Sequence, residues 1–111
     1  MTLRRIFAHL SCRDLEASSD WSCKVFGRAP DAAPMDGLRE WHQGDGGFQL
    51  FQDGDSAGYG TMTLIVDDLA SELDRLRSSG VEIAETSTGD VAMICQLRDP
   101  DSNLIVLAEP T

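Results

Sequence analysis

Apolar residues recur at three- and four-residue spacing in two stretches of the chain, and each stretch begins at an Asp-Leu pair and ends at a glycine. The first pattern predicts a helix over about residues 15–26. Asp14 is the expected N-cap, because a carboxylate accepts hydrogen bonds from the unpaired N–H groups of a first turn. Gly27 is the expected stop. The residues of the buried face are Leu15, Ser18, Trp21, Ser22, Val25 and Phe26.

The second stretch repeats this design over about residues 69–79. Asp68 is its expected N-cap and Gly80 its stop, and the arginines of the last turn suit the negative end of the helix dipole. The residues of its apolar face are Leu69, Leu73 and Leu76.

Short apolar stretches on both sides of the helices have the composition of β-strands. We expect strands at residues 3–10 and 61–66 before the helices, and at 38–43, 47–52, 81–84, 90–97 and 103–108 after them. Residues 29–34 contain Pro30 and Pro34 and are expected to form a loop.

The two halves of the chain also share residues at a constant offset. Residues 10–15 read LSCRDL and residues 64–69 read LIVDDL, so that Leu10, Asp14 and Leu15 recur 54 positions later as Leu64, Asp68 and Leu69. A repeat of this size indicates a duplicated structural unit. We predict an α+β fold of two tandem βαβββ modules that form a curved, cup-like mixed β-sheet with the helices outside. One domain spans 1–111, with module one at about 1–53, a glycine-containing linker at about 53–60, and module two at about 61–111.

Length, charge and cysteine content exclude several classes of function. A chain of 111 residues is the size of one domain. Its net charge of −10 disfavours nucleic acids and anionic membranes as partners. No apolar run approaches the ~20 residues of a membrane span, and the N-terminus lacks the apolar core of a signal peptide, so we expect a cytoplasmic protein.

The three cysteines have no metal-binding spacing and are expected to be reduced structural thiols, with a thiol near a pocket as the alternative. No serine-nucleophile elbow or phosphate-binding loop is present.

The repeated order of strand, Asp-Leu, helix and glycine, together with the segment DPDSNLIVLAE near the end, resembles the vicinal oxygen chelate superfamily. This superfamily includes glyoxalase I, bleomycin-resistance proteins, fosfomycin-resistance enzymes and extradiol dioxygenases. The resemblance covers nearly the whole chain, and residues 99–103 (DPDSN) are similar to the family's DPDGN turn. It implies a homodimer, formed either by edge-to-edge packing or by exchange of modules between chains.

Enzymes of this family usually hold one divalent ion with His, Gln or Glu side chains. The resemblance puts the corresponding positions of this chain at Phe7, Gln49, Thr61 and Val106. Phe and Val cannot bind a metal and Thr is a weak ligand, so we expect no metal cofactor.

An atypical metal site is the alternative, with Gln49, His9 and Glu109 as its ligands. His9 points to the same side of its strand as Phe7, whereas Glu109 would need a β-bulge to replace Val106. The sequence does not determine the register of the strand that carries His42, and so does not determine which face of the sheet His42 is on.

Strand alternation also predicts the lining of a small-molecule pocket. His9 is a candidate base or hydrogen-bond partner, and a half-buried structural histidine is the alternative. Trp41 is a candidate to stack on a flat ligand, with a dimer contact or the edge of the core as the alternatives. The remaining candidate ligand-binding residues are Phe7, Gln49, Phe51, Thr61, Thr63, Ile94, Gln96, Leu104 and Val106.

Three functional hypotheses follow. The first is a metal-independent protein of the glyoxalase/bleomycin-resistance type that sequesters or carries a small apolar or aromatic ligand. The second is a lyase, isomerase or dioxygenase-like enzyme that uses His9 as a base or an atypical metal site. The third is a filled interior without a cavity, in which case the protein is an interaction or structural partner.

Overall fold

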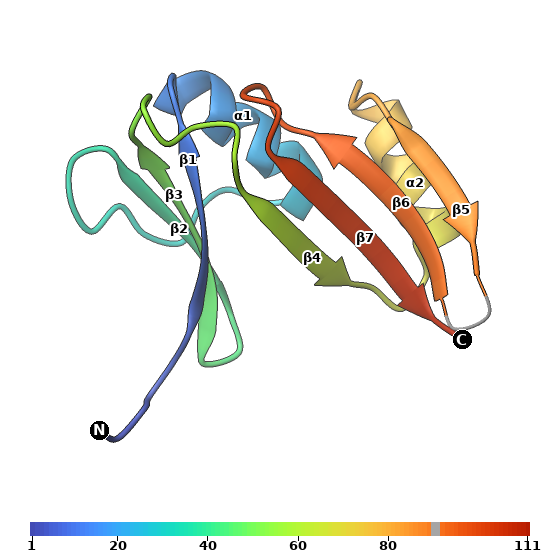
Figure 1. Cartoon of the computed structure of the whole chain (residues 1–111), viewed down its shortest axis with the longest axis horizontal. Coiled ribbons are helices and arrows are strands. Elements are labelled where there is room, and N and C mark those ends of the chain that lie inside the picture. Colours follow the sequence, from blue (N-terminus) through green and yellow to red (C-terminus); the bar gives the residue numbers. More distant parts are fainter. Residues whose placement is uncertain (90–91) are drawn as a thin grey trace.

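The first module is a three-stranded sheet with one helix packed on it (Figure 1). In the computed structural model, which describes residues 1–89 and 92–111, the elements of this module are β1 (Phe7–Cys12), α1 (Leu15–Phe26), β2 (Leu38–Gln43) and β3 (Gly46–Gln52). The strand order is β1-β3-β2, with β1 parallel and β2 antiparallel to β3. An isolated bridge between Ala32 and Glu40 lies at the place of the first strand after the helix.

The second module repeats the arrangement with a four-stranded sheet. Its elements are β4 (Thr61–Ile65), α2 (Leu69–Ser78), β5 (Glu85–Thr88), β6 (Ala92–Arg98) and β7 (Leu104–Pro110). The strand order is β4-β7-β6-β5, and β4 is parallel to β7. The predicted α+β class and the repeated βαβββ pattern are therefore confirmed, and in Figure 1 both helices lie behind the sheets.

Both helix starts follow the predicted capping chemistry. The Asp14 carboxylate accepts a hydrogen bond from the backbone N–H of Ala17 at 3.2 Å, and the Asp68 carboxylate accepts one from that of Ser71 at 3.1 Å. Gly27 ends α1 in the left-handed region, with φ of 71°. These bonds satisfy N–H groups that a helix leaves unpaired, so local sequence suffices to set where each helix begins.

Two strand predictions need correction. The first strand begins at Phe7 rather than at residue 3, and the strand predicted at 81–84 is found at Glu85–Thr88 instead. The reason is the end of α2, where the backbone N–H of Val81 bonds to the carbonyl oxygen of Leu76 and the Val81 side chain is buried. Of the predicted strand 90–97, residues 90 and 91 lie outside the described part, and the rest belongs to β6.

The two modules share one hydrophobic core between the sheets and the helices. Trp41 is central to it, since its ring stacks 5.6 Å from that of Phe26 and lies 5.6 Å from that of Phe48. Its indole N–H donates a hydrogen bond to the Arg28 carbonyl oxygen at 3.0 Å. Among the described residues, no helix is long and apolar enough to cross a membrane.

Asn103 joins the modules where β7 begins, and its side chain is completely buried. Its amide oxygen accepts hydrogen bonds from the backbone N–H groups of Gly58 and Gly60 at 3.0 and 2.9 Å. Its amide nitrogen donates to the Ser11 carbonyl oxygen at 2.9 Å and to the Asp99 carboxylate at 2.8 Å. Contacts from one side chain to both β1 and the approach to β4 hold the modules together at this end.

Candidate functional site

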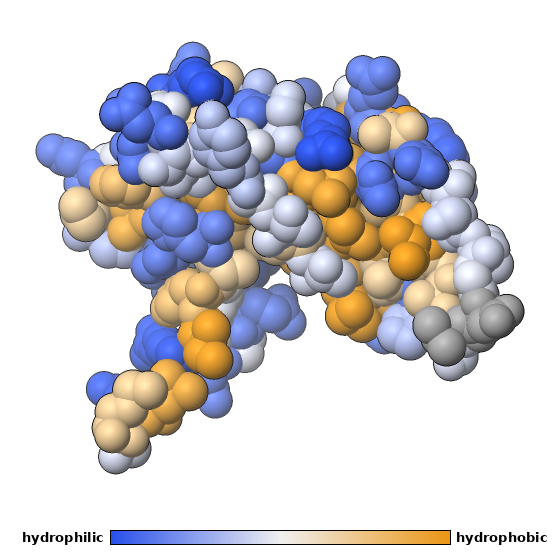
Figure 2. All heavy atoms as spheres, in the orientation of Figure 1, coloured by the Kyte–Doolittle hydropathy of each residue, from blue (hydrophilic) through white to orange (hydrophobic). Residues whose placement is uncertain are grey.

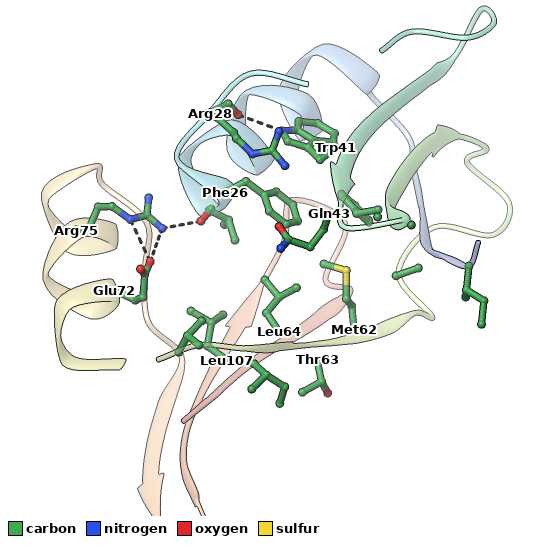
Figure 3. Close-up of a pocket in the computed structure, with 18 residues that line it drawn as sticks. Phe26, Arg28, Trp41, Gln43, Met62, Thr63, Leu64, Glu72, Arg75 and Leu107 are labelled. Carbon is green, nitrogen blue, oxygen red and sulfur yellow. Dashed lines mark hydrogen bonds and ion pairs between the residues drawn. The ribbon is translucent and has the colours of Figure 1, made fainter. Parts of the chain in front are cut away.

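A cleft of about 560 Å³ lies between the two modules. The C-terminal end of α1, the middle of α2, the edge strand β4 and the first sheet surround it (Figure 3). Its lining residues are Ile6, Ala8, Val25, Phe26, Arg28, Trp41, Gln43, Gly46, Gly47, Phe48, Met62, Thr63, Leu64, Ile65, Val66, Glu72, Arg75 and Leu107.

The cleft is apolar on both sides. The first module contributes the stacked rings of Phe26 and Phe48, with centroids 5.4 Å apart. Met62 and Leu64 of β4 face Phe26 in Figure 3. This aromatic and aliphatic lining could hold a flat or branched apolar molecule by removing its surface from water.

The charged side chains at the cleft already have partners. The guanidinium of Arg75 donates to the Glu72 carboxylate at 2.7 Å and to the carbonyl oxygens of Lys24 and Val25 at 2.6 Å each. Arg28 likewise bonds to Asp31 and to a carbonyl oxygen of β2. Arg75 therefore holds the C-terminal end of α1, and Arg28 holds the segment after α1 against β2, so that both guanidinium groups already have acceptors.

One neutral side chain supplies the polar group that the cleft can offer a ligand. Gln43 lines the cleft, and its side chain has no hydrogen-bond partner within the described part of the chain. Thr63 is also part of the lining, but its side chain points to the opposite side of β4 from those of Met62 and Leu64 (Figure 3). A small molecule in the cleft would therefore meet apolar walls with one amide. This is the usual make-up of a small-molecule site.

Most of the predicted ligand-binding residues lie elsewhere, on the sheet faces that point away from the helices. On the first sheet, the register pairs His9 with Gln49, and Phe7 and Phe51 share their side of the strands. On the second sheet, the residues of the corresponding face are Thr61, Thr63, Ile94, Gln96, Leu104 and Val106. We call these two surfaces the open faces. Only Trp41 and Thr63 of the predicted set line the cleft, and a binding role for the others stays a prediction.

Trp41 does not lie among the predicted open-face residues. Its pairing with Phe48 puts it on the helix side of the first sheet, where the side chain is 1% exposed. Trp41 therefore lies at the wall of the cleft, on the opposite side of the sheet from the open-face residues, and its stacking on a ligand stays a prediction. The sequence shows a tryptophan in a strand, but only the strand register decides which face carries it.

A row of polar side chains crosses the open face of the first sheet. His9 Nδ1 lies 3.3 Å from Gln49 Oε1, and Gln49 Nε2 donates to Glu40 Oε2 at 2.7 Å. His42 Nε2 donates to the other Glu40 oxygen at 3.0 Å. The bonds from Gln49 first, and then from His42, hold the pKa of the Glu40 carboxyl below its usual range. We call these four residues the polar row.

Aromatic rings flank the polar row. The Phe7 and His42 rings meet edge to face, with centroids 6.1 Å apart, across Gly47, which has no side chain to separate them. The Phe51 ring lies 6.2 Å from that of His9. Glu40 was not among the predicted site residues, and its two-residue spacing from His42 was the only signal in the sequence that the two share a face.

The open face of the second sheet is more apolar. Val106 lies between Thr63 of β4 and Gln96 of β6 in the register, and Leu104 pairs with Thr61. Figure 2 shows apolar surface over this sheet and along the N-terminal segment, where Leu3 is exposed.

The residues at the family's metal positions do not fit a divalent ion. Phe7 and Val106 have no donor atom, and both ends of the Gln49 amide are occupied by hydrogen bonds. Glu109, an alternative ligand, accepts a hydrogen bond from the Leu69 backbone N–H at 2.8 Å on the helix side of its sheet. Among the described residues, no group of three or more His, Cys, Asp or Glu side chains could hold a metal ion.

Comparison with solved structures shows close likeness over nearly the whole chain. A glyoxalase/bleomycin resistance protein from Catenulispora acidiphila DSM 44928 is 26% identical, with a TM-score of 0.89 over 95% of this chain and 96% of that one. The lactoylglutathione lyase of Agrobacterium tumefaciens is 19% identical, with a TM-score of 0.78 over 94% and 91%. TnmS3, an antibiotic binding protein from Streptomyces sp. CB03234, is 20% identical, with a TM-score of 0.77 over 100% and 97%.

No curated protein matches the chain. A family model does match, over residues 5–107, and it covers both modules and both helix starts. The chain therefore belongs to the Glyoxalase/Bleomycin resistance protein/Dioxygenase superfamily.

Proposed function

We propose that this chain is a metal-independent protein that binds a small apolar or aromatic molecule and sequesters or carries it. The observation that carries the proposal is the cleft between the modules. Its volume of about 560 Å³ falls inside the range of about 300–1,000 Å³ that is usual for small-molecule sites.

The chemistry of the cleft supports an uncharged ligand. Arg28 and Arg75 are engaged in ion pairs and bonds to backbone, which leaves the Gln43 amide to orient a bound molecule. A filled interior, the third hypothesis, does not fit a cleft of this size. The name of TnmS3, a protein of similar fold, describes antibiotic binding and is consistent with this function.

Metal independence is part of the proposal, because Phe7 and Val106 stand where the family's pattern has ligands. We also propose a homodimer. The exposed apolar side chains of the N-terminal segment, Leu3 and Ile6, and that of Ile65 on β4 would be covered by a second copy of the chain. A cytoplasmic location agrees with three cysteines that are all free thiols.

A matched pair of variants tests the cleft. Leu64→Trp fills the cleft from β4, whereas Thr61→Trp adds the same side chain on the same strand outside it. Isothermal titration with apolar aromatic compounds should show that Leu64→Trp weakens binding by about tenfold or more, equivalent to the ~1.4 kcal/mol of a tenfold change in Kd. Thr61→Trp should leave binding unchanged. Equal affinity of both variants would place the ligand outside the cleft.

Native mass spectrometry of untagged protein, purified without chelators, tests the remaining parts. A dimer without a metal ion is the expected mass, and a co-purified organic molecule would identify the ligand. One chelator-removable divalent ion per chain, required for binding, would overturn metal independence, and a monomer at micromolar concentration would overturn the homodimer.

The polar row favours a second candidate, an enzyme in which His9 is a base. Hydrogen bonds that connect the His9 imidazole to a carboxylate through Gln49 are an arrangement that orients catalytic histidines. Turnover abolished by His9→Phe, with binding in the cleft retained, would favour the enzyme.

A further inference from the structure

A second cavity lies on the helix side of the second sheet. α2 packs on β6 and β7 and lies behind β6 and β5 in Figure 1, and a groove of about 360 Å³ remains between α2 and the β5 edge of the sheet. We call it the α2–β5 groove. It shares no lining residue with the cleft, so the two are separate sites. Its lining residues are Leu69, Leu73, Arg77, Thr86, Ser87, Thr88, Met93 and Ile94.

One end of the groove is polar. Burial raises the pKa of the Cys95 thiol and the Arg77 charge opposes that rise, so the guanidinium lies near Cys95. Cys95 pairs with Thr86 of β5, which puts the Thr86 side chain at the same end. Within the described part of the chain, the Arg77 guanidinium forms no hydrogen bond or ion pair, in contrast to Arg28 and Arg75 at the cleft. This end therefore offers an unpaired cation to an anionic group.

The other end of the groove is apolar and already carries a negative charge. Leu69 and Leu73 lie one helical turn apart on α2, and both line the groove together with Met93 of β6. Met93 pairs with Glu109, whose carboxylate accepts the Leu69 backbone N–H at 2.8 Å. A bound anion is repelled from this end by Glu109 and attracted to the other end by Arg77.

The length of the groove limits the size of the ligand. From Leu69 to Arg77, α2 rises by about 12 Å at 1.5 Å per residue, roughly the length of an extended eight-carbon chain with its head group. We propose that the α2–β5 groove binds an unbranched aliphatic carboxylate of about eight carbons, with its carboxylate on Arg77 and its chain along Leu73 and Met93. A guanidinium suits this head group because its planar fork donates two parallel N–H bonds to one carboxylate. The site does not depend on the cleft or on the proposed function.

Methyl NMR of ¹³C-labelled methionine locates the ligand, with octanoate as the probe. The chain has four methionines: Met93 lines the groove, Met62 lines the cleft, and Met1 and Met35 are exposed elsewhere. We expect octanoate, kept below the concentration at which it forms micelles, to shift the Met93 signal saturably. No saturable shift at Met93 would overturn the proposal. If Met62 shifts instead, octanoate binds in the cleft, which overturns the groove site and leaves the proposed function intact.

Comparison with 1-octanol tests the role of Arg77, because the alcohol has the same chain without the charge. We expect the wild type to bind octanoate about three- to fivefold more tightly than 1-octanol, as is usual for an exposed ion pair. Arg77→Gln should abolish this preference. Arg4→Gln is the matched control, since it removes the same charge from an exposed arginine of the N-terminal segment and should retain the preference. Equal affinity of the wild type for both probes, or a preference that persists in Arg77→Gln, would overturn the proposal.

Shorter carboxylates test whether the chain lies in the groove. Each methylene group removed from water strengthens binding, so we expect the affinity to rise about twofold or more per methylene from butanoate to octanoate. The Met93 shift should grow with chain length in the same series. If butanoate and octanoate bind equally well, then Arg77 is only a surface cation for small anions, and the proposed aliphatic carboxylate site is wrong.

Discussion

Asn103→Ala is expected to destabilise this fold more than its small change in volume implies. The Asn103 side chain is completely buried and makes four hydrogen bonds, two accepted and two donated. Its removal leaves the N–H groups of Gly58 and Gly60 and the carbonyl oxygen of Ser11 without these partners. The contacts link β1 to the segment that leads into β4, so their loss weakens the junction between the modules.

The magnitude follows from the cost of unpaired groups. An unsatisfied buried donor or acceptor costs about 1–3 kcal/mol, and the glycines are half-buried, so that water can reach part of the site. We expect the free energy of unfolding to fall by about 3 kcal/mol. For a domain of this size, that corresponds to a Tm lowered by roughly 10–20 °C.

Urea denaturation followed by circular dichroism measures this change, and hydrogen exchange locates it. The amides of Gly58 and Gly60 should lose protection, because Asn103 supplies their acceptor. Ser102→Ala is the matched control, since Ser102 is exposed in the same turn. Removal of its hydroxyl should change the free energy of unfolding by no more than about 0.5 kcal/mol. A variant as stable as this control, with both glycine amides still protected, would refute the reasoning.

Three further predictions concern strain, thiols and pH. Ser102 has φ of 72°, where glycine is favoured, so Ser102→Gly should raise the free energy of unfolding by about 0.5–1 kcal/mol in urea denaturation. Burial raises the pKa of the Cys12 thiol to about 11, and it also raises the pKa of Cys95 and of Cys23. Cys12 and Cys95 are buried whereas Cys23 is half-buried, so a thiol reagent at pH 8 should reach and modify Cys23 first. Hydrogen bonds from the neighbouring amide, and then from the imidazole, lower the pKa of Glu40, so its ionised form stabilises the fold above about pH 4.5. That contribution should be lost as the pH falls through the lowered value, and Glu40→Gln should remove this part of the pH dependence of the urea midpoint.

Each of these predictions has a contrary result. A lower urea midpoint in Ser102→Gly would mean that the serine is not strained. Modification of Cys12 at the same rate as Cys23 in the native protein would contradict its burial. If the acid limb of the stability profile is identical in Glu40→Gln and the wild type, then Glu40 does not contribute through its ionisation.

Local sequence was enough to determine where the helices begin and that the chain is duplicated. Asp14 and Asp68 act within one turn of themselves, so their neighbours in sequence define the caps. Strand alternation likewise grouped His9 with Phe7 and Gln49 with Phe51, because the side-chain period of a strand is a local property. The strand predicted at 81–84 was wrong because the Val81 backbone N–H bonds to the end of α2. Strand propensity describes single residues and does not predict such a contact.

Tertiary structure alone decided which surfaces meet. Trp41 lies on the helix side because β2 pairs with β3 in one register, and a shift by one residue would move every side chain of the strand to the other face. The cleft depends on β4 facing the first module, and the polar row depends on Glu40 and His9 meeting through Gln49 across three strands. Each of these contacts joins residues far apart in sequence. Their free energy depends on packing and hydrogen bonding in three dimensions, which a pattern along the chain does not encode.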